Sequence, residues 1–167
     1  MKKNVEPDYP LLATAPRAAD QAVKRRARVL IAEDDYAFRD LLVFAFEDDG
    51  YEAVSVPDGY DLLEVLGASL LPGSSVKPFD LVVSDVRMPR WSGLATLERL
   101  SHSPMVPPVV IITAFGSEEV HHRAKQAGAV TVLDKPFDVA DLVDLSHRVI
   151  AQRPRRSQGD EPVRADA

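Results

Sequence analysis

Five polar side chains stand where short apolar runs of this sequence end. Such runs, four or five residues long and bounded by turn-forming residues, are typical of buried parallel strands. The five side chains are Glu33, Asp34, Asp85, Thr113 and Lys135. Because the carboxyl ends of the strands in an open parallel sheet line one cleft, we expect these groups to lie close together.

The acids in this set favour a divalent cation and a phosphoryl transfer. Carboxylates within a few ångströms of one another repel, and a cation relieves that repulsion. An oxygen-only set with few protein ligands suits Mg²⁺, with Mn²⁺ as the alternative ion. Beside the metal, the Asp85 carboxylate can attack phosphorus and become an acyl phosphate. The Lys135 ammonium would neutralise the phosphoryl oxygens, and the Thr113 hydroxyl could hydrogen-bond the product.

Alternating strand and helix patterns must position these residues. The predicted strands cover 28–32, 52–56, 80–85, 108–113 and 130–133. A helical pattern follows each strand, with N-caps predicted at Asp35, Ser117 and Asp138. Five βα units in strict alternation indicate a doubly wound parallel sheet with helices on both faces. Right-handed crossovers favour the strand order 2-1-3-4-5, the flavodoxin-like (βα)5 fold of the α/β class.

Two connections within this pattern have unusual length or composition. Residues 67–79 are rich in turn formers and are long for a link between a helix and a strand, which usually has about 2–6 residues. The loop after Asp85 contains Trp91, which is either a partner contact or an aromatic that covers the edge of the core.

Length and composition fit one globular domain with polar flanks. The chain has 167 residues, 46% of them apolar. We expect the domain to cover 28–152, with disordered segments at 1–27 and 153–167. Residues 28–150 contain ten basic and twenty acidic residues, net −10. This charge argues against direct nucleic-acid binding by the domain.

Several other classes are excluded by composition. The absence of cysteine rules out disulfides, zinc-thiolate sites and thiol catalysis. No stretch approaches the roughly 18 apolar residues of a membrane span. Lys2 and Lys3 are followed by Pro7 and Asp8 rather than by the apolar region of a signal peptide. We therefore expect a cytoplasmic protein that does not contact membranes.

Four motifs resemble the receiver domain of two-component response regulators, in a chemotaxis-regulator-like, stand-alone form. They are Val29-Leu-Ile-Ala-Glu33-Asp34-Asp35, Asp85-Val-Arg-Met-Pro89 with Ser92-Gly93-Leu94, Ile112-Thr113-Ala114, and Lys135-Pro136-Phe137. They lie within residues 28–150 in the order and spacing of that family. The combination of D-x-x-M-P with K-P-F makes the resemblance specific.

The resemblance implies a role for each matched residue. Carried over by position, the matches are the metal-binding acidic pair Glu33 and Asp34, the phosphoacceptor Asp85, the metal-ligating backbone carbonyl of Arg87, the switch hydroxyl Thr113 and the phosphate-contacting Lys135. The resemblance also implies a cis peptide bond between Lys135 and Pro136, which is otherwise the minority state.

This sequence departs from the family pattern at the acidic pair and at the switch. Glu33 stands where aspartate is commoner, and Val132 occupies the switch position usually held by an aromatic residue. Because valine has no ring and only χ1 to turn, we expect a weak output signal, or one carried by another residue of the fourth-helix/fifth-strand face. Arg87 and Phe115 flank the site and are both bulky. We expect them to hinder the attacking water and to prolong the phosphorylated state.

The main functional hypothesis is a stand-alone receiver. It would accept a phosphoryl group from the phosphohistidine of a histidine kinase, then bind a downstream protein or relay phosphate to a histidine phosphotransfer protein. Only fifteen residues, most of them polar, follow residue 152, too few for a DNA-binding domain. Such a protein is not an enzyme beyond its own phosphotransfer and autodephosphorylation.

Three other functions compete with this one. Val132 and Glu33 leave open a degenerate receiver that binds partners constitutively without phosphorylation. A metal-dependent phosphohydrolase would need a second acid near the nucleophile, but the residue two positions after Asp85 is Arg87. A nucleotide-binding domain is disfavoured because the sequence has no G-x-G-x-x-G and no G-K-[ST] loop.

Overall fold

Five parallel strands form the centre of the computed structural model, which describes residues 25–101 and 103–152. They are β1 (Arg28–Ala32), β2 (Glu52–Val56), β3 (Leu81–Asp85), β4 (Val109–Thr113) and β5 (Thr131–Asp134). Every neighbouring pair is parallel, and the order is β2-β1-β3-β4-β5. The predicted flavodoxin-like doubly wound fold is therefore confirmed.

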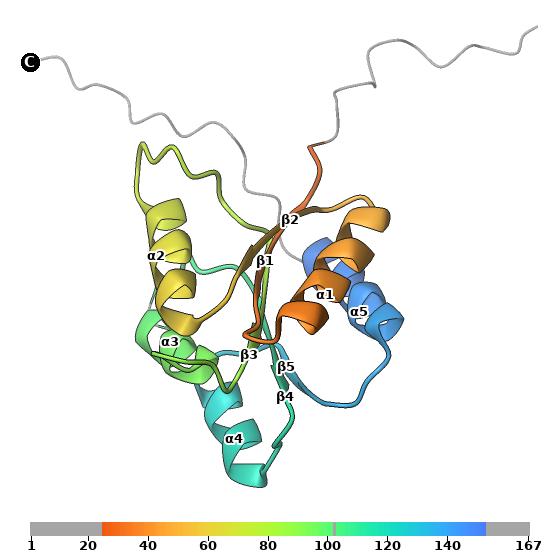
Figure 1. The fold of residues 1–167 in the computed structure, drawn as a ribbon. Helices are drawn as coiled ribbons and strands as arrows, with labels where there is room; N and C mark the ends of the chain where they lie inside the picture. The colour runs from red at the N-terminus through yellow and green to blue at the C-terminus, as the bar shows by residue number, and fades with distance from the viewer. Residues whose placement is uncertain (1–24, 102, 153–167) are drawn as a thin grey trace, which may run out of the picture.

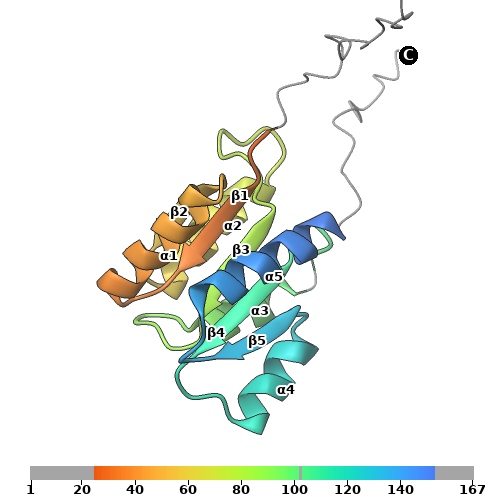
Figure 2. The same ribbon diagram turned by 90° about the vertical axis from the view of Figure 1, so that its right-hand side faces the viewer.

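Helices cover both faces of this sheet. They are α1 (Tyr36–Asp48), α2 (Gly59–Leu70), α3 (Gly93–Leu100), α4 (Glu118–Gln126) and α5 (Val139–Ala151). Helices α1 and α5 lie on one face, whereas α2, α3 and α4 lie on the other (Figures 1 and 2). The three-layer arrangement leaves the two ends of the strands uncovered by helices, and the carboxyl ends carry the candidate site.

The two sides of the sheet pack into separate hydrophobic clusters. Leu30, Val82 and Ile111 face the cluster that includes residues of α2, α3 and α4. The residues that alternate with them, such as Val83 and Ile112, face the cluster beneath α1 and α5. Because both faces are covered, the β1, β3 and β4 strands are buried along their whole length. This double burial explains why their sequences are nearly continuous apolar runs.

The helices begin and end at residues suited to those places. Asp35, Ser117 and Asp138 each accept a hydrogen bond from a backbone N–H in the first helical turn, which confirms the predicted N-caps. Gly50 and Gly128 follow α1 and α4 with φ of +90°, a conformation that glycine adopts without the usual steric cost.

The predicted connection at 67–79 is shorter than expected, because α2 continues to Leu70. Ser69 is buried there, and its hydroxyl donates a hydrogen bond to the backbone oxygen of Leu66 at 2.7 Å. Packing on the sheet therefore outweighs the low helix propensity of Gly67 and Ser69. Strand β5 also lies one residue later than predicted.

The predicted flanking segments lie almost entirely outside the described residues. Of 1–27 and 153–167, the structure describes only 25–27, which lead into β1. Arg25 there donates to the Asp80 carboxylate at 2.8 Å. Among the described residues, the helices are too short or too polar to cross a membrane.

Candidate functional site

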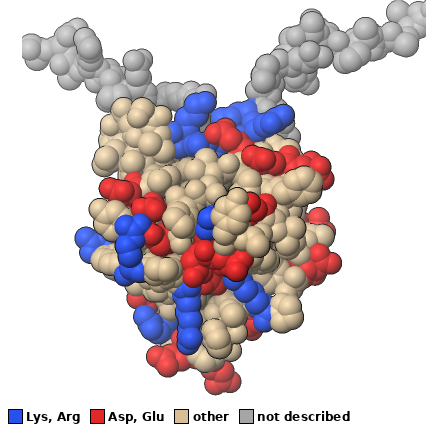
Figure 3. All heavy atoms as spheres, viewed as in Figure 1, with Lys and Arg blue, Asp and Glu red and all other residues tan. Residues whose placement is uncertain are grey.

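The residues singled out in the sequence come together at the carboxyl ends of four neighbouring strands. Glu33 and Asp34 directly follow β1, Asp85 ends β3, Thr113 ends β4, and Lys135 directly follows β5. Strands β1, β3, β4 and β5 are consecutive in the sheet, so their ends form a continuous edge. Figure 3 shows acidic side chains gathered near the middle of this side of the molecule, with basic side chains beside them.

Three carboxylates form the centre of the site. One oxygen each from Glu33, Asp34 and Asp85 lies within 4.8 Å of the others. Glu33 and Asp85 are buried, whereas Asp34 is exposed, so the cluster opens to solvent on one side. Three hard oxygen donors on an open rim fit an ion that retains several waters, as Mg²⁺ does.

Lys135 supplies the positive charge nearest to these acids. Its Nζ lies 2.8 Å from Oε2 of Glu33 and 3.2 Å from Oδ1 of Asp85. One ammonium does not balance three carboxylates, so this cluster retains negative charge that a divalent cation would neutralise. The cis peptide bond predicted between Lys135 and Pro136 is present.

Burial and charge shift the protonation equilibria in opposite directions at this site. Burial raises the pKa of the Asp85 carboxyl above its usual range, although the Lys135 charge and hydrogen bond oppose that shift. Burial likewise raises the pKa of Glu33, against the same lysine. For Lys135, burial would lower the pKa, but hydrogen bonding to Glu33 and the charges of both acids raise it. The ammonium therefore stays protonated, while the two buried carboxylates are poorly stabilised as anions without a metal.

The backbone and Arg87 hold the Asp85 carboxylate in one orientation. The Arg87 N–H donates to Oδ2 of Asp85 at 2.8 Å, while Oδ1 faces Lys135. Both carboxylate oxygens are therefore engaged from different sides. The metal-ligand role of the Arg87 carbonyl remains a prediction.

Thr113 is buried directly beside these groups. Its hydroxyl oxygen accepts a hydrogen bond from the Phe115 N–H at 3.1 Å, and its backbone oxygen accepts one from the Lys135 N–H at 2.7 Å. The second bond connects β4 to the segment that carries the lysine. Thr113 thus connects the site to the β4–α4 loop, while its function as a switch stays a prediction.

Two aromatic contacts at the site were missed in the sequence. The Arg87 guanidinium lies over the Phe115 ring at 4.2 Å from its centroid, so the two bulky flanking side chains touch. The Lys135 Nζ lies 4.6 Å from the centroid of the Phe38 ring. Phe38 is interpretable from sequence only as a core-facing residue of a helix. No pattern in the sequence signals its contact with Lys135, which lies in a distant part of the chain.

The loop after β3 is held tightly against neighbouring elements. Arg90 has a positive φ of 63°, and its guanidinium pairs with Asp58 and Asp61 near the start of α2. A Cβ on Gly93 would lie 2.1 Å from the Asp85 backbone oxygen, so α3 begins in close contact with the end of β3. These contacts fix the chain that carries Arg87 beside the carboxylates.

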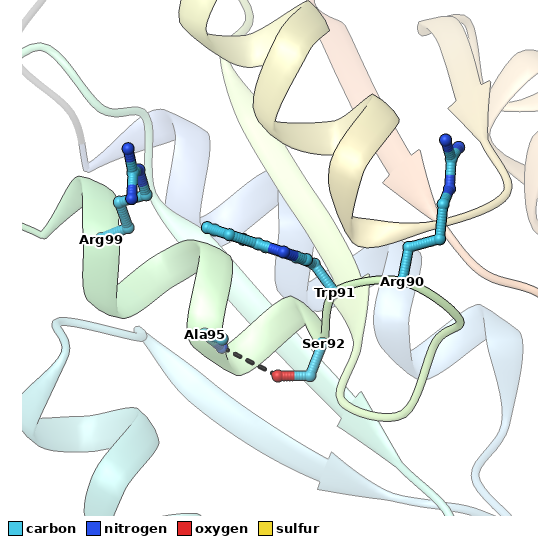
Figure 4. A pocket seen from close by; sticks show the side chains of 5 residues that line it. All are labelled: Arg90, Trp91, Ser92, Ala95 and Arg99. Atoms are coloured by element: carbon cyan, nitrogen blue, oxygen red, sulfur yellow. Dashed lines mark hydrogen bonds between the residues drawn. The ribbon is translucent and has the colours of Figure 1, made fainter.

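Trp91 lies on this loop but outside the acidic cluster. It lines a shallow pocket with Arg90, Ser92, Ala95 and Arg99, and its indole lies 5.4 Å from the Arg99 guanidinium (Figure 4). The side chain is 37% exposed. The Arg99 contact covers one face of the indole.

Val132 lies on β5, two strands away from Asp85. It is partly buried and packs against the cluster on the α2, α3 and α4 side of the sheet. It lies at the sheet edge, on a strand that contacts α4, and its role as the switch position stays a prediction.

The comparisons with known proteins agree with this geometry. A family model described as the response regulator receiver domain matches residues 29–147. The transcriptional regulatory protein PdtaR of Mycobacterium tuberculosis is 39% identical over 126 residues, which cover 75% of this chain and 56% of PdtaR. Sporulation initiation phosphotransferase F of Bacillus subtilis is 30% identical over 117 residues, covering 70% of this chain and 88% of that protein. The chain thus spans little more than half of PdtaR.

Solved receiver structures share the same architecture. The chemotaxis protein CheY4 of Vibrio cholerae has a TM-score of 0.64 and 28% identity, covering 75% of this chain and 99% of that one. The signal receiver domain of a LuxO repressor protein from Vibrio parahaemolyticus has a TM-score of 0.66 and 27% identity, covering 76% and 92%. Sequence, fold and the convergence of acids and lysine all agree. This chain therefore belongs to the response regulator receiver domain family of two-component systems.

Proposed function

We propose that this receiver accepts a phosphoryl group on Asp85 from the phosphohistidine of a histidine kinase or a histidine phosphotransfer protein. The observation that carries the proposal is the buried Asp85 carboxylate, held 3.2 Å from Lys135 within a cluster of three acids. An isolated acid at a strand end would have no such neighbours. A lysine and paired acids beside a carboxylate nucleophile are the groups that phosphoryl transfer requires.

Each residue has a distinct part in this transfer. An Asp85 oxygen forms a bond to phosphorus while the bond from phosphorus to the donor histidine nitrogen breaks. Glu33, Asp34, Asp85 and the Arg87 carbonyl would hold Mg²⁺, with Mn²⁺ as a substitute. The metal supplies positive charge to the phosphoryl oxygens. Lys135 contacts the same oxygens from the β5 side, and the Thr113 hydroxyl donates a hydrogen bond to the product.

The exposed surface of α1 is our proposed contact for the phosphodonor. Tyr36, Leu41 and Phe44 on this helix are 69%, 49% and 68% exposed. Large exposed apolar side chains on one helix are typical of a protein interaction site. The N-terminal end of α1 directly follows Glu33 and Asp34, so a partner bound here would reach Asp85.

The names of the relatives support a role in regulation by phosphotransfer. Sporulation initiation phosphotransferase F is named for phosphotransfer, and PdtaR is named as a transcriptional regulator. We propose that the phosphorylated chain binds a downstream protein or passes phosphate to a phosphotransfer protein, in the cytoplasm and without contacting nucleic acid or membranes. Its only chemistry would be its own phosphorylation and autodephosphorylation.

A direct test is incubation of the purified protein with acetyl phosphate and Mg²⁺, followed by intact mass spectrometry. We expect the mass to increase by one phosphoryl group. No increase should occur when Mg²⁺ is chelated before acetyl phosphate is added. The matched control is Asp85→Asn, which keeps the side-chain size and removes the nucleophile. A wild-type protein that gains no phosphate, or an Asp85→Asn variant that still does, would contradict the proposal.

A constitutive binding module is the second candidate. Val132 at the switch position and Glu33 in the acidic pair are the residues that favour it. In this case, a downstream partner would bind wild type and Asp85→Asn equally well, with or without acetyl phosphate. Phosphate-dependent binding would exclude it.

A further inference from the structure

We propose that Phe38 is a positioning residue for Lys135, holding the ammonium in the cleft while the carboxylates are engaged by a cation. This inference rests on the proposed phosphoryl transfer at Asp85. Its physical basis is the contact between the lysine ammonium and the face of the Phe38 ring. The sequence pattern predicts only that Phe38 faces the core.

Within the described part of the chain, the Lys135 ammonium contacts two carboxylates and one aromatic ring. The carboxylates are those of Glu33 and Asp85, at 2.8 Å and 3.2 Å. The ring is that of Phe38, whose centroid lies 4.6 Å from Nζ. The lysine side chain is 23% exposed, so the ring contributes to a partly desolvated contact. A cation at this distance from a ring face is attracted to the ring quadrupole.

The Phe38 ring is held in place from two directions. Its backbone N–H donates to the N-cap Asp35 at 2.7 Å, which fixes the first turn of α1. Its ring meets Phe137 edge-on, with centroids 6.0 Å apart and planes at 70°. Phe137 lies two residues after Lys135 and packs against the cluster beneath α1 and α5. The ring and the lysine are therefore positioned by the same contact between α1 and the chain after β5.

The ring becomes more important when a divalent cation binds. A cation at Glu33, Asp34 and Asp85 neutralises the charges that attract Lys135, and it repels the ammonium directly. The Phe38 ring has no oxygen or nitrogen atom for a hard cation to recruit, so its attraction persists. It is the neighbour that keeps Lys135 beside Asp85 in the loaded site, where the lysine must meet the phosphoryl oxygens.

NMR can measure this contact without any chemistry. In protein labelled with ¹³C-lysine, the Lys135 ε-methylene signals should be shifted upfield by the ring current of Phe38, with Lys135→Arg for assignment. We expect the upfield shift to persist after Mg²⁺ is added, and to disappear in Phe38→Leu. A shift that returns to the value of exposed lysines on adding Mg²⁺ to wild type would overturn the inference.

Phosphorylation kinetics test the functional consequence. Phe38→Leu should be phosphorylated by acetyl phosphate about three- to tenfold more slowly at saturating Mg²⁺, the range expected for one such contact. Its half-saturating Mg²⁺ concentration should be unchanged or lower, because the lysine competes less for the carboxylates. Phe38→Tyr keeps the ring and should retain the wild-type rate. Phe137→Leu removes a neighbouring ring that does not contact the ammonium, and should be slowed less.

The outcomes separate this inference from the proposed function. A wild-type protein that gains no phosphate, yet keeps the Mg²⁺-resistant ring shift, would defeat the function and leave the positioning intact. Normal phosphorylation of Phe38→Leu at saturating Mg²⁺ would defeat the positioning alone. An equal loss in Phe38→Tyr and Phe38→Leu would also defeat it, since it would trace the effect to packing rather than to the ring face. Thermal melts establish that each variant is folded.

Discussion

Asp85 shows how a buried carboxylate can reduce the stability of the protein that carries it. Its carboxylate is buried beside two other acids, and burial raises its pKa. The Arg87 N–H and Lys135 compensate only in part. A neutral isostere at this position should therefore be tolerated better than the native charge.

Replacing Asp85 by asparagine should stabilise the metal-free protein by about 1 kcal/mol. Because the pKa of the Asp85 carboxyl is raised on folding, the folded state binds more protons than the unfolded state over a window of pH. This window runs from the ordinary carboxyl pKa of about 4 to the raised pKa. In that window wild-type stability increases as pH falls, and it decreases as pH rises. Urea unfolding in EDTA between pH 5 and pH 8 measures both effects. The pH slope should be smaller in Asp85→Asn, and an unchanged slope would argue against the burial effect.

The stacked pair of Arg87 and Phe115 leads to a prediction about phosphate lifetime. The guanidinium lies 4.2 Å from the ring centroid, and the backbone N–H of Arg87 donates to the proposed phosphoacceptor, Asp85. A double variant, Arg87→Asn with Phe115→Ala, removes this bulk and should lose phosphate roughly tenfold faster, since water gains access to the acyl phosphate. Dephosphorylation after removal of acetyl phosphate can be followed by Phos-tag electrophoresis. Equal lifetimes in the variant and wild type would contradict the shielding.

The sequence was sufficient to predict which residues meet at the site, but not their contacts. Strand-end acids, a hydroxyl and a lysine could be placed together because parallel strands end at one edge. The Phe38 and Phe115 contacts could not be predicted, since they depend on side-chain rotamers and on the path of the loops. Periodicity gives the face of a helix on which a ring lies, but not the atom that it touches.

At the scale of elements, the junction of β3 and α3 is limited by space. A Cβ on Gly93 would lie 2.1 Å from both the Asp85 backbone oxygen and the Ser84 hydroxyl. Gly93→Ala should therefore cost roughly 1–3 kcal/mol, because the start of α3 must move away from β3. Gly67→Ala in α2 is the matched control, since its Cβ would meet nothing within 4 Å. Chemical denaturation compares the two, and equal stabilities would disprove the steric limit.

Tyr51 connects the start of β2 to α5 through His147. The phenol oxygen lies 2.8 Å from His147 Nδ1, and burial, then the charge of Asp49, raises the pKa of Tyr51 to about 12. Because the unfolded tyrosine ionises near pH 10, stability should fall as pH rises from about 10 to about 12. Tyr51→Phe should lose about 0.5–1.5 kcal/mol at pH 8 and lack part of this fall. Denaturant unfolding of wild type and Tyr51→Phe at pH 8 and between about pH 10 and about pH 12 measures both effects. The control is Tyr36→Phe, a substitution at an exposed tyrosine.

Element boundaries were less predictable than element types. The periodic patterns identified all five strands and five helices, because each buried face repeats at its own spacing. The end of α2 was placed too early, since Gly67 and Ser69 are poor helix formers in isolation. The burial of Ser69 and its hydrogen bond to the backbone oxygen of Leu66 accompany the last turn of the helix, and that burial is not visible in local sequence.

At the scale of the whole molecule, the alternation of strands and helices was enough to predict the fold. The conformational response to phosphorylation could not be predicted in the same way. A parallel sheet with right-handed crossovers has few possible topologies. The response to phosphorylation depends on the free-energy difference between two packed states of the same chain. Periodicity reports the packing of one state, so the free-energy difference that sets the role of Val132 is a quantity for experiment.

Val132 leads to the prediction with the widest reach. It is partly buried against the α2, α3 and α4 side of the core, and it has only χ1 to turn. Addition of beryllofluoride and Mg²⁺, which mimic the phosphorylated state, should therefore shift backbone NMR signals mainly in the loops around Asp85, Thr113 and Lys135. Few signals should move across α4 and β5. The matched variant Val132→Tyr supplies a ring at this position and should spread the shifts across that face. Large shifts on α4 and β5 in the wild type would show that another residue carries the signal.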